Sequence, residues 1–443
     1  MTIKVGLVSL GCPKNLVDSE IMLGLLKESG FIITSREQEA DAIIINTCSF
    51  INDAKEESIK TILELAQLKK EGNCRALLVA GCLAQRYHRE LMKEMPEIDG
   101  FIGTGAVHEV PELVRRALAG EKASLVGKPG YLHTAAQPRI QATPSYTAYS
   151  KIAEGCDNRC SYCTIPLVRG PFRSRDMEDI VNEATGMLKQ GVKELVLVAQ
   201  DTTRYGLDLY GHPSLDSLLE RLAGLEGLVW IRLLYTYPSL ISEQLIRLIA
   251  SGKNICRYLD IPLQHASDSV LKRMKRQGSN AEILQLIEKL RAEVPGIILR
   301  SSFIVGFPGE TEDNFEELLC FMRKVQFDRV GVFTYSREEG TPAASMSGQV
   351  PEETKLARRD KAMSLQQKIS YEKNCGKIGT ELLVLVEKKS AGGTYTGRSE
   401  GDAPGIDGKV HFTSELHLEP GDFANVLITA AQPYDLNGKL VYE

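Results

Sequence analysis

The amino-acid sequence predicts an α/β protein with two successive parallel-sheet regions, followed by a small all-β barrel. Three observations predict this architecture. Short apolar segments alternate with longer amphipathic segments over residues 1–120, and the alternation resumes from residue 148 to about residue 335. Such alternation is typical of parallel sheets covered by helices. Residues 376–443 contain only short segments separated by Gly, Asp and Pro, which is typical of a small barrel.

The first region, residues 1–120, is predicted to be an α/β domain with four strands. The apolar strand segments are residues 4–10, 41–46, 75–80 and 101–104. Helical spacing of apolar residues predicts helices at residues 16–30, 53–70, 84–95 and 110–119. Residues 121–147 lack such periodicity and contain three prolines, so we expect a linker there.

The second region, residues 148–375, is predicted to be a partial TIM barrel of (β/α)6 type. Its six strand segments are residues 148–152, 194–199, 229–234, 258–262, 296–305 and 329–333. Six successive strand–helix units form a barrel or part of one. A charged helix is expected over residues 351–374. The strands of the terminal barrel, residues 376–443, are predicted at residues 380–386, 393–397, 408–412 and 423–430.

Length, composition and charge narrow the class of protein. A chain of 443 residues is too long for one ordinary domain. No run approaches the roughly 18 apolar residues of a membrane span. The first residues lack the long apolar core of a signal peptide, so we expect a cytoplasmic protein without a membrane partner. The net charge of −5 argues weakly against a dominant nucleic-acid role.

Cys156, Cys160 and Cys163 form a CxxxCxxC motif directly after a predicted strand. Three thiolates at this spacing can hold three irons of a 4Fe-4S cluster and leave the fourth iron open to a small molecule. The alternatives are a zinc site or a chance spacing. Zinc sites usually pair two CxxC units, and this sequence has no second pair. The motif therefore favours an iron–sulfur cluster.

Cys12, Cys48 and Cys82 each follow one of the first three predicted strands. The carboxyl ends of parallel strands meet at one edge of a sheet, where ligands bind. Helix starts at these turns can stabilise thiolates. We therefore expect a second 4Fe-4S cluster, also with one open iron; the alternative is three buried structural cysteines. Inert packing is expected for the other four cysteines, which are Cys74, Cys256, Cys320 and Cys375.

The CxxxCxxC motif, with Tyr162 before its last cysteine, resembles the radical S-adenosylmethionine (radical SAM) superfamily. With the N-terminal cysteines and the terminal barrel, the whole chain resembles the methylthiotransferases, and the barrel resembles their TRAM domain. The resemblance implies that S-adenosylmethionine binds at the open iron and is cleaved to a 5′-deoxyadenosyl radical. The residues expected to contact this cofactor are Tyr162, Gln200, Gln264 and Gly306. The alternative for Tyr162 is an aromatic residue of the core. The alternative for Gln200 and Gln264 is a polar side chain at a strand end whose hydrogen bonds are satisfied within the protein.

The family that this chain resembles has two main branches, one acting on transfer RNA and one on a ribosomal protein. Four segments resemble the protein-modifying branch: SLGCPKNLVDSE, AQDTTRYG, YLDIPLQHAS and RSEGDAPGIDG. Residues 376–443 contain six Lys and Arg against ten Asp and Glu. An RNA-binding module should be basic, whereas an acidic barrel suits a basic ribosomal protein. The alternative is that the acidic residues of the barrel form only a solvated surface and bind no partner.

The resemblance implies a methylthiolation of one aspartate in the small-subunit ribosomal protein S-twelve. The radical would remove hydrogen from the aspartate β-carbon, and sulfur held at the second cluster would be added there. S-adenosylmethionine would be both the radical source and the methyl donor. A one-electron donor such as flavodoxin and a sulfur donor are the other expected partners. The alternatives are a transfer-RNA adenosine methylthiotransferase, a non-catalytic iron–sulfur electron carrier and a binding adaptor with inactive clusters.

Overall fold

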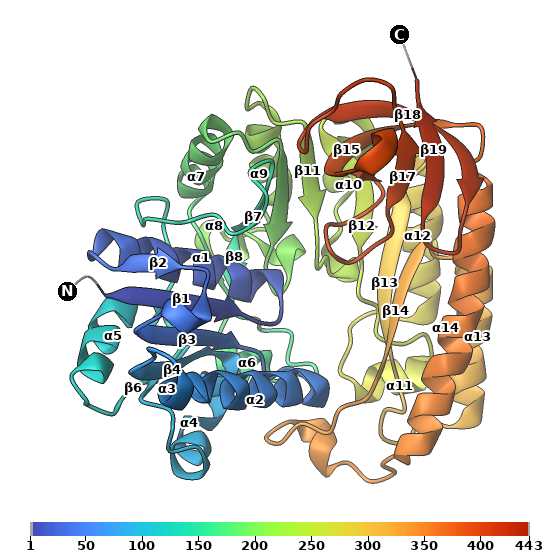
Figure 1. Ribbon diagram of the computed structural model, residues 1–443. Coiled ribbons are helices and arrows are strands. Elements are labelled where there is room, and N and C mark those ends of the chain that lie inside the picture. The colour runs from blue at the N-terminus through green and yellow to red at the C-terminus, as the bar shows by residue number, and fades with distance from the viewer. Residues whose placement is uncertain (1–2, 442–443) are drawn as a thin grey trace.

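Six parallel strands form the N-terminal sheet of the computed structural model, which describes residues 3–441. Their order is β2-β1-β3-β4-β5-β6 (Figure 1). The bounds are β1 (Lys4–Ser9), β2 (Ile32–Thr34), β3 (Ala42–Thr47), β4 (Ala76–Gly81), β5 (Gly100–Ile102) and β6 (Ala123–Leu125). All four predicted strands are present. β2 and β6 were not predicted because three residues are too few for a periodic pattern, and β6 lies within the segment expected to be a linker.

Helices lie on both faces of this sheet. They are α1 (Pro13–Glu28), α2 (Asn52–Ala66), α3 (Leu68–Glu71), α4 (Cys82–Glu94) and α5 (Val110–Leu118). α1 starts with Pro13, whose ring is suited to the first helical position. The turn into α4 requires glycine at position 81: its φ is 89°, and a Cβ there would lie 2.2 Å from Oδ1 of Asn46.

The central sheet also has six parallel strands, in the order β14-β13-β12-β11-β10-β7, and confirms the six predicted strands. They are β7 (Thr147–Lys151), β10 (Glu194–Val198), β11 (Trp230–Leu233), β12 (Ile255–Asp260), β13 (Ile298–Val305) and β14 (Arg329–Thr334). β7 and β14 do not pair with each other, so the sheet is an open, partial barrel. A small antiparallel pair, β8 (Ala153–Glu154) and β9 (Arg173–Ser174), follows β7.

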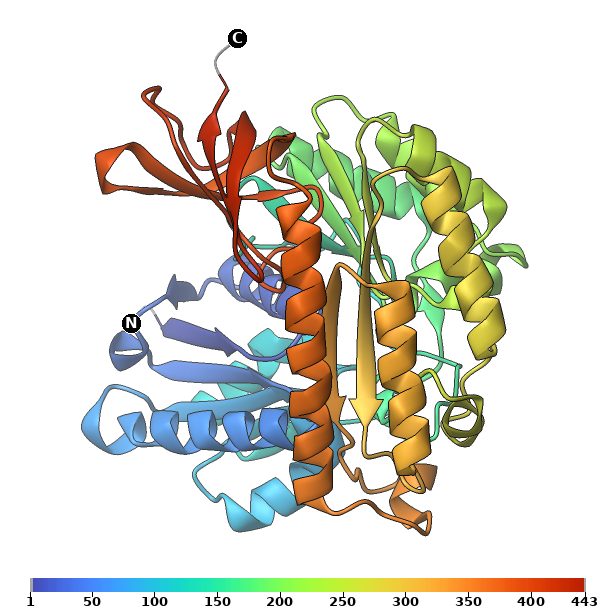
Figure 2. The ribbon, with the colours of Figure 1, turned by 90° about the vertical axis from the view of Figure 1, so that its right-hand side faces the viewer.

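The central helices cover the outer face of this sheet, and Figure 2 shows α13 and α14 side by side over β13 and β14. The longer helices are α7 (Met177–Lys189), α9 (Leu215–Ala223), α10 (Glu243–Ser251), α12 (Asn280–Glu293), α13 (Glu312–Val325) and α14 (Glu352–Cys375). The short ones are α6 (Ile165–Arg169), α8 (Leu207–Tyr210) and α11 (Asp268–Arg273). The single-turn 3-10 helices are η1 (Glu37–Glu39), η2 (Val107–Glu109), η3 (Thr202–Arg204), η4 (Pro238–Leu240), η5 (Pro342–Ser345) and η6 (Ala391–Gly393).

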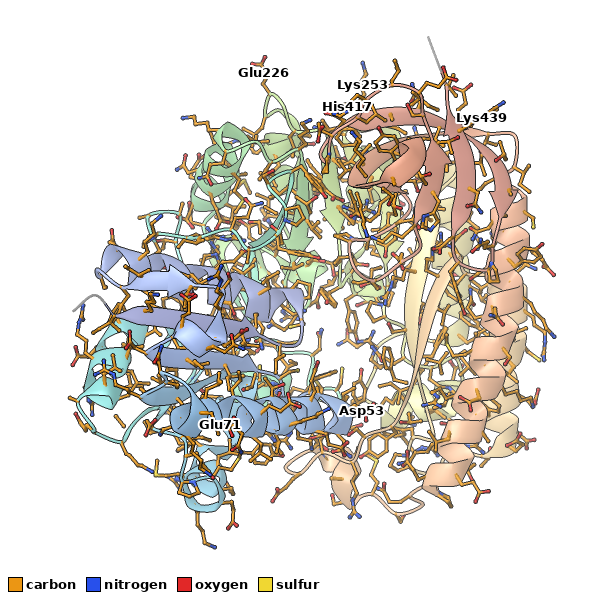
Figure 3. The ribbon with its side chains drawn as sticks, in the orientation of Figure 1. Asp53, Glu71, Glu226, Lys253, His417 and Lys439 are labelled. Carbon is orange, nitrogen blue, oxygen red and sulfur yellow. The ribbon has the colours of Figure 1, made fainter. Side chains whose placement is uncertain are left out.

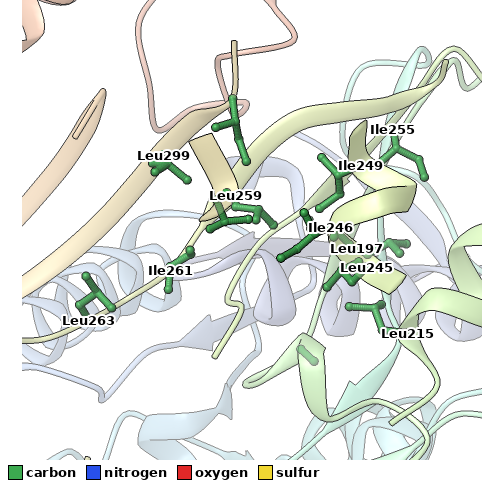
Figure 4. Close-up of a cluster of buried hydrophobic side chains, with 14 of the residues drawn as sticks. Leu197, Leu215, Leu245, Ile246, Ile249, Ile255, Leu259, Ile261, Leu263 and Leu299 are labelled. Atoms are coloured by element: carbon green, nitrogen blue, oxygen red, sulfur yellow. The ribbon is translucent and has the colours of Figure 1, made fainter. Parts of the chain in front are cut away.

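The largest apolar core lies between the outer face of the central sheet and these helices. Leu197 and Leu259 of the sheet pack with Leu215 and Ile246 of the helices, and all four are buried (Figure 4). Burying one such side chain contributes about 1.5–3 kcal/mol. This core therefore fixes the strands whose carboxyl ends carry the candidate site.

The C-terminal residues form a closed barrel in the order β15-β16-β17-β19-β18. Its strands are β15 (Glu381–Ser390), β16 (Thr394–Ser399), β17 (Val410–Thr413), β18 (Phe423–Ala431) and β19 (Leu436–Leu440). The first four correspond to the predicted strands. β19 was not predicted, because its sequence, LNGKL, contains Asn and Gly, which are depleted in strands.

The barrel lies against the amino ends of the central strands (Figures 1 and 2). Arg398 donates to both carboxylate oxygens of Glu194, the first residue of β10, at 2.5 and 3.1 Å. Arg329, the first residue of β14, pairs with Asp402 at 2.8 Å. Tyr258 donates to Asp407 at 2.7 Å. The charged residues of the RSEGDAPGIDG segment are therefore largely buried in a joint between barrel and sheet.

The segment before β7 is tightly fastened, although it has no regular secondary structure after β6. Arg139 pairs with Glu20 of α1 and, at 3.2 Å, with Glu183 of α7. The backbone N–H of Ile140 donates to the carbonyl of Glu20 at 3.0 Å. A Cβ at Gly24 would lie 2.2 Å from the carbonyl oxygen of Pro138, so glycine lets this segment lie directly on α1. The exact domain boundaries stay a prediction.

A second contact joins the N-terminal domain to the segment after β14. Glu338 pairs with Lys55 of α2 at 3.0 Å and with Arg86 of α4 at 2.6 Å. Figure 3 shows Asp53 at the start of α2, where the helix reaches this segment. The N-terminal domain is thus held at both edges of the central sheet. Within residues 3–441, no helix combines the length and apolarity needed to cross a membrane.

Candidate active site

The carboxyl ends of the two parallel sheets face each other. Lys14, two residues after Cys12 at the start of α1, extends to the carboxyl ends of two central strands. Its Nζ lies 3.3 Å above the ring centre of Tyr235, which follows β11, and 3.5 Å from the carbonyl oxygen of Ala199, which follows β10. The predicted N-terminal cysteine site therefore opens toward the central domain.

The three N-terminal cysteines lie at the carboxyl edge of their sheet, as predicted. Cys12 caps α1 after β1, Cys48 follows β3, and Cys82 begins α4 after β4. Gly11 is so close to Cys48 that a Cβ at Gly11 would lie 2.7 Å from its Cβ. Burial, with smaller contributions from the neighbouring Cys82 and Cys12, raises the pKa of the Cys48 thiol to about 12. The three thiols thus lie within electrostatic reach of one another.

Asn15 holds the three N-terminal cysteine loops together. Its Nδ2 donates to the carbonyl of Leu10, before Cys12, at 3.2 Å and to the carbonyl of Thr47, before Cys48, at 2.8 Å. Its Oδ1 accepts from the thiol of Cys82 at 3.8 Å. One buried side chain therefore sets the spacing of all three loops.

The central cysteines lie in the loop between β8 and α6. The backbone N–H of Cys156 donates to the carbonyl of Gly170 at 3.1 Å, and that of Cys163 donates to the carbonyl of Cys160 at 3.1 Å. Gly155, before the motif, has a φ of 80°, and a Cβ there would lie 2.0 Å from the carbonyl oxygen of Pro171. Glycine is therefore required where the chain enters this loop.

Two hydrogen-bond donors lie beside sulfurs of the central loop. The N–H of Ile165, at the start of α6, donates to Sγ of Cys163 at 3.5 Å. Nη1 of Arg276 lies 3.9 Å from Sγ of Cys160. Burial raises the pKa of the Cys156 thiol to about 11. Bare thiols with such pKa values stay protonated near neutral pH, so iron must displace protons when it binds.

The donor set consists of cysteine thiols, and thiolates are the ligands of iron–sulfur cubes. Among residues 3–441, no three His, Cys, Asp or Glu side chains converge as the ligands of one metal ion must. A cube places each thiolate on a different iron, so its ligands stand around the cluster instead of meeting at a point. Six thiols in two groups of three, with N–H donors beside the sulfurs, have the chemistry that such cubes require.

A buried ionic network lies between the two cysteine sets. Arg169 pairs with Asp18 of α1 at 2.6 Å and with Glu154 of β8 at 3.2 Å. Lys151 pairs with the same two carboxylates, at 2.7 Å for Glu154. Burial alone would raise the pKa of Glu154, but Arg169 and Lys151 outweigh it and hold this pKa well below the usual range. The network joins the N-terminal domain to the central cysteine loop.

Three regions of the chain match known families. Residues 4–103 match "Uncharacterized protein family UPF0004", residues 150–322 match the Radical SAM superfamily, and residues 378–441 match the TRAM domain. A protein of Pelotomaculum thermopropionicum, "Ribosomal protein uS12 methylthiotransferase RimO", is 67% identical over 443 residues, with both chains fully covered. The chain belongs to the RimO family of methylthiotransferases. A RimO protein of Clostridioides difficile is 49% identical over 441 residues, 100% of this chain and 99% of that one.

Solved structures show the fold that the RimO family shares with other radical SAM enzymes. The radical S-adenosylmethionine methyltransferase TsrM from Kitasatospora setae has a TM-score of 0.57 at 13% identity. The match covers 92% of this chain and 82% of TsrM, whose structure contains a 4Fe-4S cluster and cobalamin. The predicted fold, with an N-terminal parallel α/β domain, a radical SAM domain and a TRAM barrel, is confirmed. Radical SAM enzymes use a 4Fe-4S cluster and S-adenosylmethionine, so this chemistry belongs to the family.

Three of the four residues expected to contact S-adenosylmethionine, Gln200, Gln264 and Gly306, follow central strands at the carboxyl edge. Gln200 follows β10, and its Nε2 donates to Glu154 at 2.8 Å. Its buried Oε1 has no partner among residues 3–441. Gln264 follows β12 with a φ of 75°; its N–H donates to Ser302 at 2.8 Å, and its carbonyl accepts from Ile304 at 2.7 Å. Both residues lie at the edge of the central sheet where the cysteine loop lies.

Tyr162 and Gly306 lie beside a small apolar cluster. Tyr162 packs against a group that includes Met274 and Phe307. Gly306 follows β13 with a φ of 72°, and a Cβ there would lie 2.2 Å from Cγ of Lys355 in α14. Packing of α14 therefore already requires glycine at position 306. Contact of these two residues with S-adenosylmethionine stays a prediction.

Sequence reasoning missed Lys14, Asn15 and Arg169, which connect the N-terminal cysteine loops to the central domain. Lys14 and Asn15 directly follow Cys12 and Pro13, and this adjacency was the available signal. Helical periodicity did not reveal them, because the buried face of α1 includes polar residues such as Asp18. Arg169 carried no signal, since its partners in the N-terminal domain, Asn15 and Asp18, are distant in sequence.

Proposed function

We propose that this protein adds a methylthio group to the β-carbon of a specific aspartate of ribosomal protein uS12, the S-twelve protein of the small subunit. The observation that carries this proposal is the pairing of two three-cysteine sets across facing sheet edges, with Lys14 reaching Ala199 and Tyr235. A radical reaction that transfers sulfur needs both centres at one substrate, because reacting atoms must lie within a few ångströms. The substrate in this proposal, uS12, comes from the name of a relative that is 67% identical to this chain.

We assign one 4Fe-4S cluster to Cys156, Cys160 and Cys163, and a second to Cys12, Cys48 and Cys82. When bound, the first would supply the electron that cleaves S-adenosylmethionine, and the second would hold the sulfur that is transferred. The protein's own contribution is positional. Asn15 fixes the N-terminal loops, the N–H of Ile165 and the guanidinium of Arg276 face the central sulfurs, and the buried ionic network keeps the two loops in register.

Four residues are proposed to hold S-adenosylmethionine: Tyr162, Gln200, Gln264 and Gly306. The unpartnered Oε1 of Gln200 supports its assignment, because a buried acceptor without a donor is costly unless a ligand supplies one. The amino group of S-adenosylmethionine is such a donor. Gln264 contributes from the neighbouring strand end, where active-site residues of these barrels collect.

The three domains would divide the work. Residues 1–120 would carry the second cluster, residues 148–375 the radical chemistry, and residues 376–443 the contact with uS12. Outward carboxylates of the barrel, such as Glu381 and Glu419, suit a basic ribosomal protein. We also propose that flavodoxin or a similar protein gives the electron, that a separate donor gives the sulfur, and that the reaction occurs in the cytoplasm, where its substrate is made.

Mass spectrometry tests this function directly. The protein is expressed in a bacterial strain that lacks the modification, and uS12 and transfer RNA are analysed from the same cells. A gain of about 46 Da on one aspartate of uS12 is expected, with no gain in cells that express Cys156→Ala. A methylthio group on transfer-RNA adenosine instead would favour the alternative branch. Absence of 5′-deoxyadenosine from the reduced protein with S-adenosylmethionine would favour an electron carrier.

A further inference from the structure

Lys14 is a buried cation without an anionic partner among residues 3–441. Only 7% of the surface of this residue is exposed to solvent. An ammonium has three donors, yet the contacts of Nζ are the carbonyl of Ala199 at 3.5 Å and the face of the Tyr235 ring at 3.3 Å. Neither neutralises the charge.

Two carboxylates of the central domain, Glu154 and Asp260, are already paired with other cations. Cys12 is the strongest electrostatic neighbour that favours the Lys14 ammonium, ahead of Glu154 and Asp260, and its thiol is assigned to iron in the second cluster. Glu154 pairs with Lys151 and Arg169 in the buried network, and Asp260 pairs with Arg300 at 2.7 Å. The ammonium of Lys14 is therefore left for an anion from outside the chain, because a buried charge is stable only when it is paired.

Lys14 lies in a position suited to contact with a group of the substrate. It lies two residues after Cys12 and touches Ala199, which precedes Gln200 with its unpartnered Oε1. Tyr235, beneath the ammonium, has a φ of 60°, which bulky residues rarely adopt. Its N–H donates to Asp260 at 3.1 Å and its carbonyl accepts from Thr202 at 3.0 Å. The ring that supports Lys14 is thus held firmly at the sheet edge.

We infer that Lys14 binds the side-chain carboxylate of the substrate aspartate between the two cysteine sets. This inference rests on the proposed function. A carboxylate held there satisfies the ammonium by a charge-assisted hydrogen bond and directs the adjacent β-carbon into the space between the sets. Lys14 would then select aspartate over asparagine, whose neutral amide cannot pair with a buried charge. Lys14 is a specificity residue in this account, and Tyr235 positions it.

The test compares two substrates and three enzyme variants as anaerobically reconstituted holoenzymes. The substrates are uS12 and uS12 with the modified aspartate changed to asparagine, and their Kd values are measured without reductant, so that no turnover occurs. Wild-type enzyme should prefer the aspartate protein about tenfold or more. Lys14→Met keeps the aliphatic stem but should bring this ratio close to one. Lys14→Arg restores the charge and should restore part of the preference.

Lys27→Met is the matched control, because Lys27 is an exposed lysine of the same helix. It should leave the ratio and the modification of uS12 unchanged. Iron content is measured in every sample. A wild-type preference that persists in Lys14→Met would overturn the inference, and so would a loss of iron in Lys14→Met with an unchanged ratio, which would assign Lys14 to the cluster. If wild-type enzyme itself fails to modify uS12, the proposed function fails instead.

Discussion

The guanidinium of Arg169 donates a hydrogen bond to Oδ1 of Asn15, across 154 residues of sequence. Arg169 ends the helix that follows the central cysteine loop, and Asn15 holds the three N-terminal loops. The same oxygen accepts from the thiol of Cys82. This contact therefore couples the geometry of the two cysteine sets, so that a rearrangement of one loop changes the position of the other.

Replacement of Asn15 by alanine should damage the N-terminal site selectively. The variant loses the bonds to Leu10 and Thr47 and leaves Arg169 without one acceptor, at a cost of about 1–3 kcal/mol. Iron per chain should fall by about half, while cleavage of S-adenosylmethionine to 5′-deoxyadenosine persists. Iron analysis and product chromatography measure both. The control is Asn73→Ala in an exposed loop; full iron content in Asn15→Ala would contradict the role of Asn15.

Removal of Arg398 should loosen the barrel from the central sheet. Glu194 and Arg398 are fully buried, and Arg232 is the other cation that pairs with Glu194, at 3.0 Å. Arg398→Met leaves this carboxylate undercompensated, which costs about 3–5 kcal/mol. Urea unfolding should show the loss, and limited proteolysis should cut near residue 376.

The matched control for Arg398→Met is Lys439→Met. Lys439 is an exposed cation of the same barrel, labelled in Figure 3. An exposed charge contributes little, so its removal should change the free energy of unfolding by less than about 1 kcal/mol. Equal effects of the two substitutions would show that the Glu194 pair does not hold the barrel in place.

Protonation of His133 should make the fold sensitive to mild acid. Burial and the nearby Arg175 lower its pKa to about 4, although Glu183 lies 3.5 Å from its Nε2. The unfolded chain takes up this proton near pH 6.5, whereas the folded chain does not, so stability falls as the pH drops from about 6.5 to about 4. The contribution of this group reaches about 3 kcal/mol at the acid end.

The measurement for His133 is the free energy of unfolding in urea at about pH 7 and about pH 5. His133→Gln cannot take up the proton in either state, so its stability should change less over this interval than that of the wild-type protein. His108→Gln, at an exposed histidine, is the control. An unchanged pH dependence in His133→Gln would refute the assignment.

The positions of the candidate cysteines in the fold could be predicted because their signals are local. The CxxxCxxC spacing is read within eight residues, and Cys12, Cys48 and Cys82 each follow an apolar strand whose carboxyl end is recognisable. Asn15 and Arg169 could not be paired in the same way, since nothing in either segment specifies a partner 154 residues away. Contacts between domains depend on how the two sheets are placed.

The strands also differ in whether a local pattern in the sequence predicts them. β3 and β4 are fully buried runs of six residues, and their apolar sequences predicted them. β2 and β6, with three residues each, form because they pair with β1 and β5, and such pairing leaves no pattern in the sequence. The RSEGDAPGIDG segment resembled the protein-modifying branch, but the resemblance did not reveal that Asp402 and Asp407 face inward to the central sheet.

The most direct test of two clusters is iron and sulfide analysis of the reconstituted wild-type protein beside two triple variants. One variant replaces Cys12, Cys48 and Cys82 with alanine, and the other replaces Cys156, Cys160 and Cys163. The account predicts about eight irons per wild-type chain and about four in each variant. About four irons in the wild-type protein, unchanged by loss of the N-terminal cysteines, would contradict it.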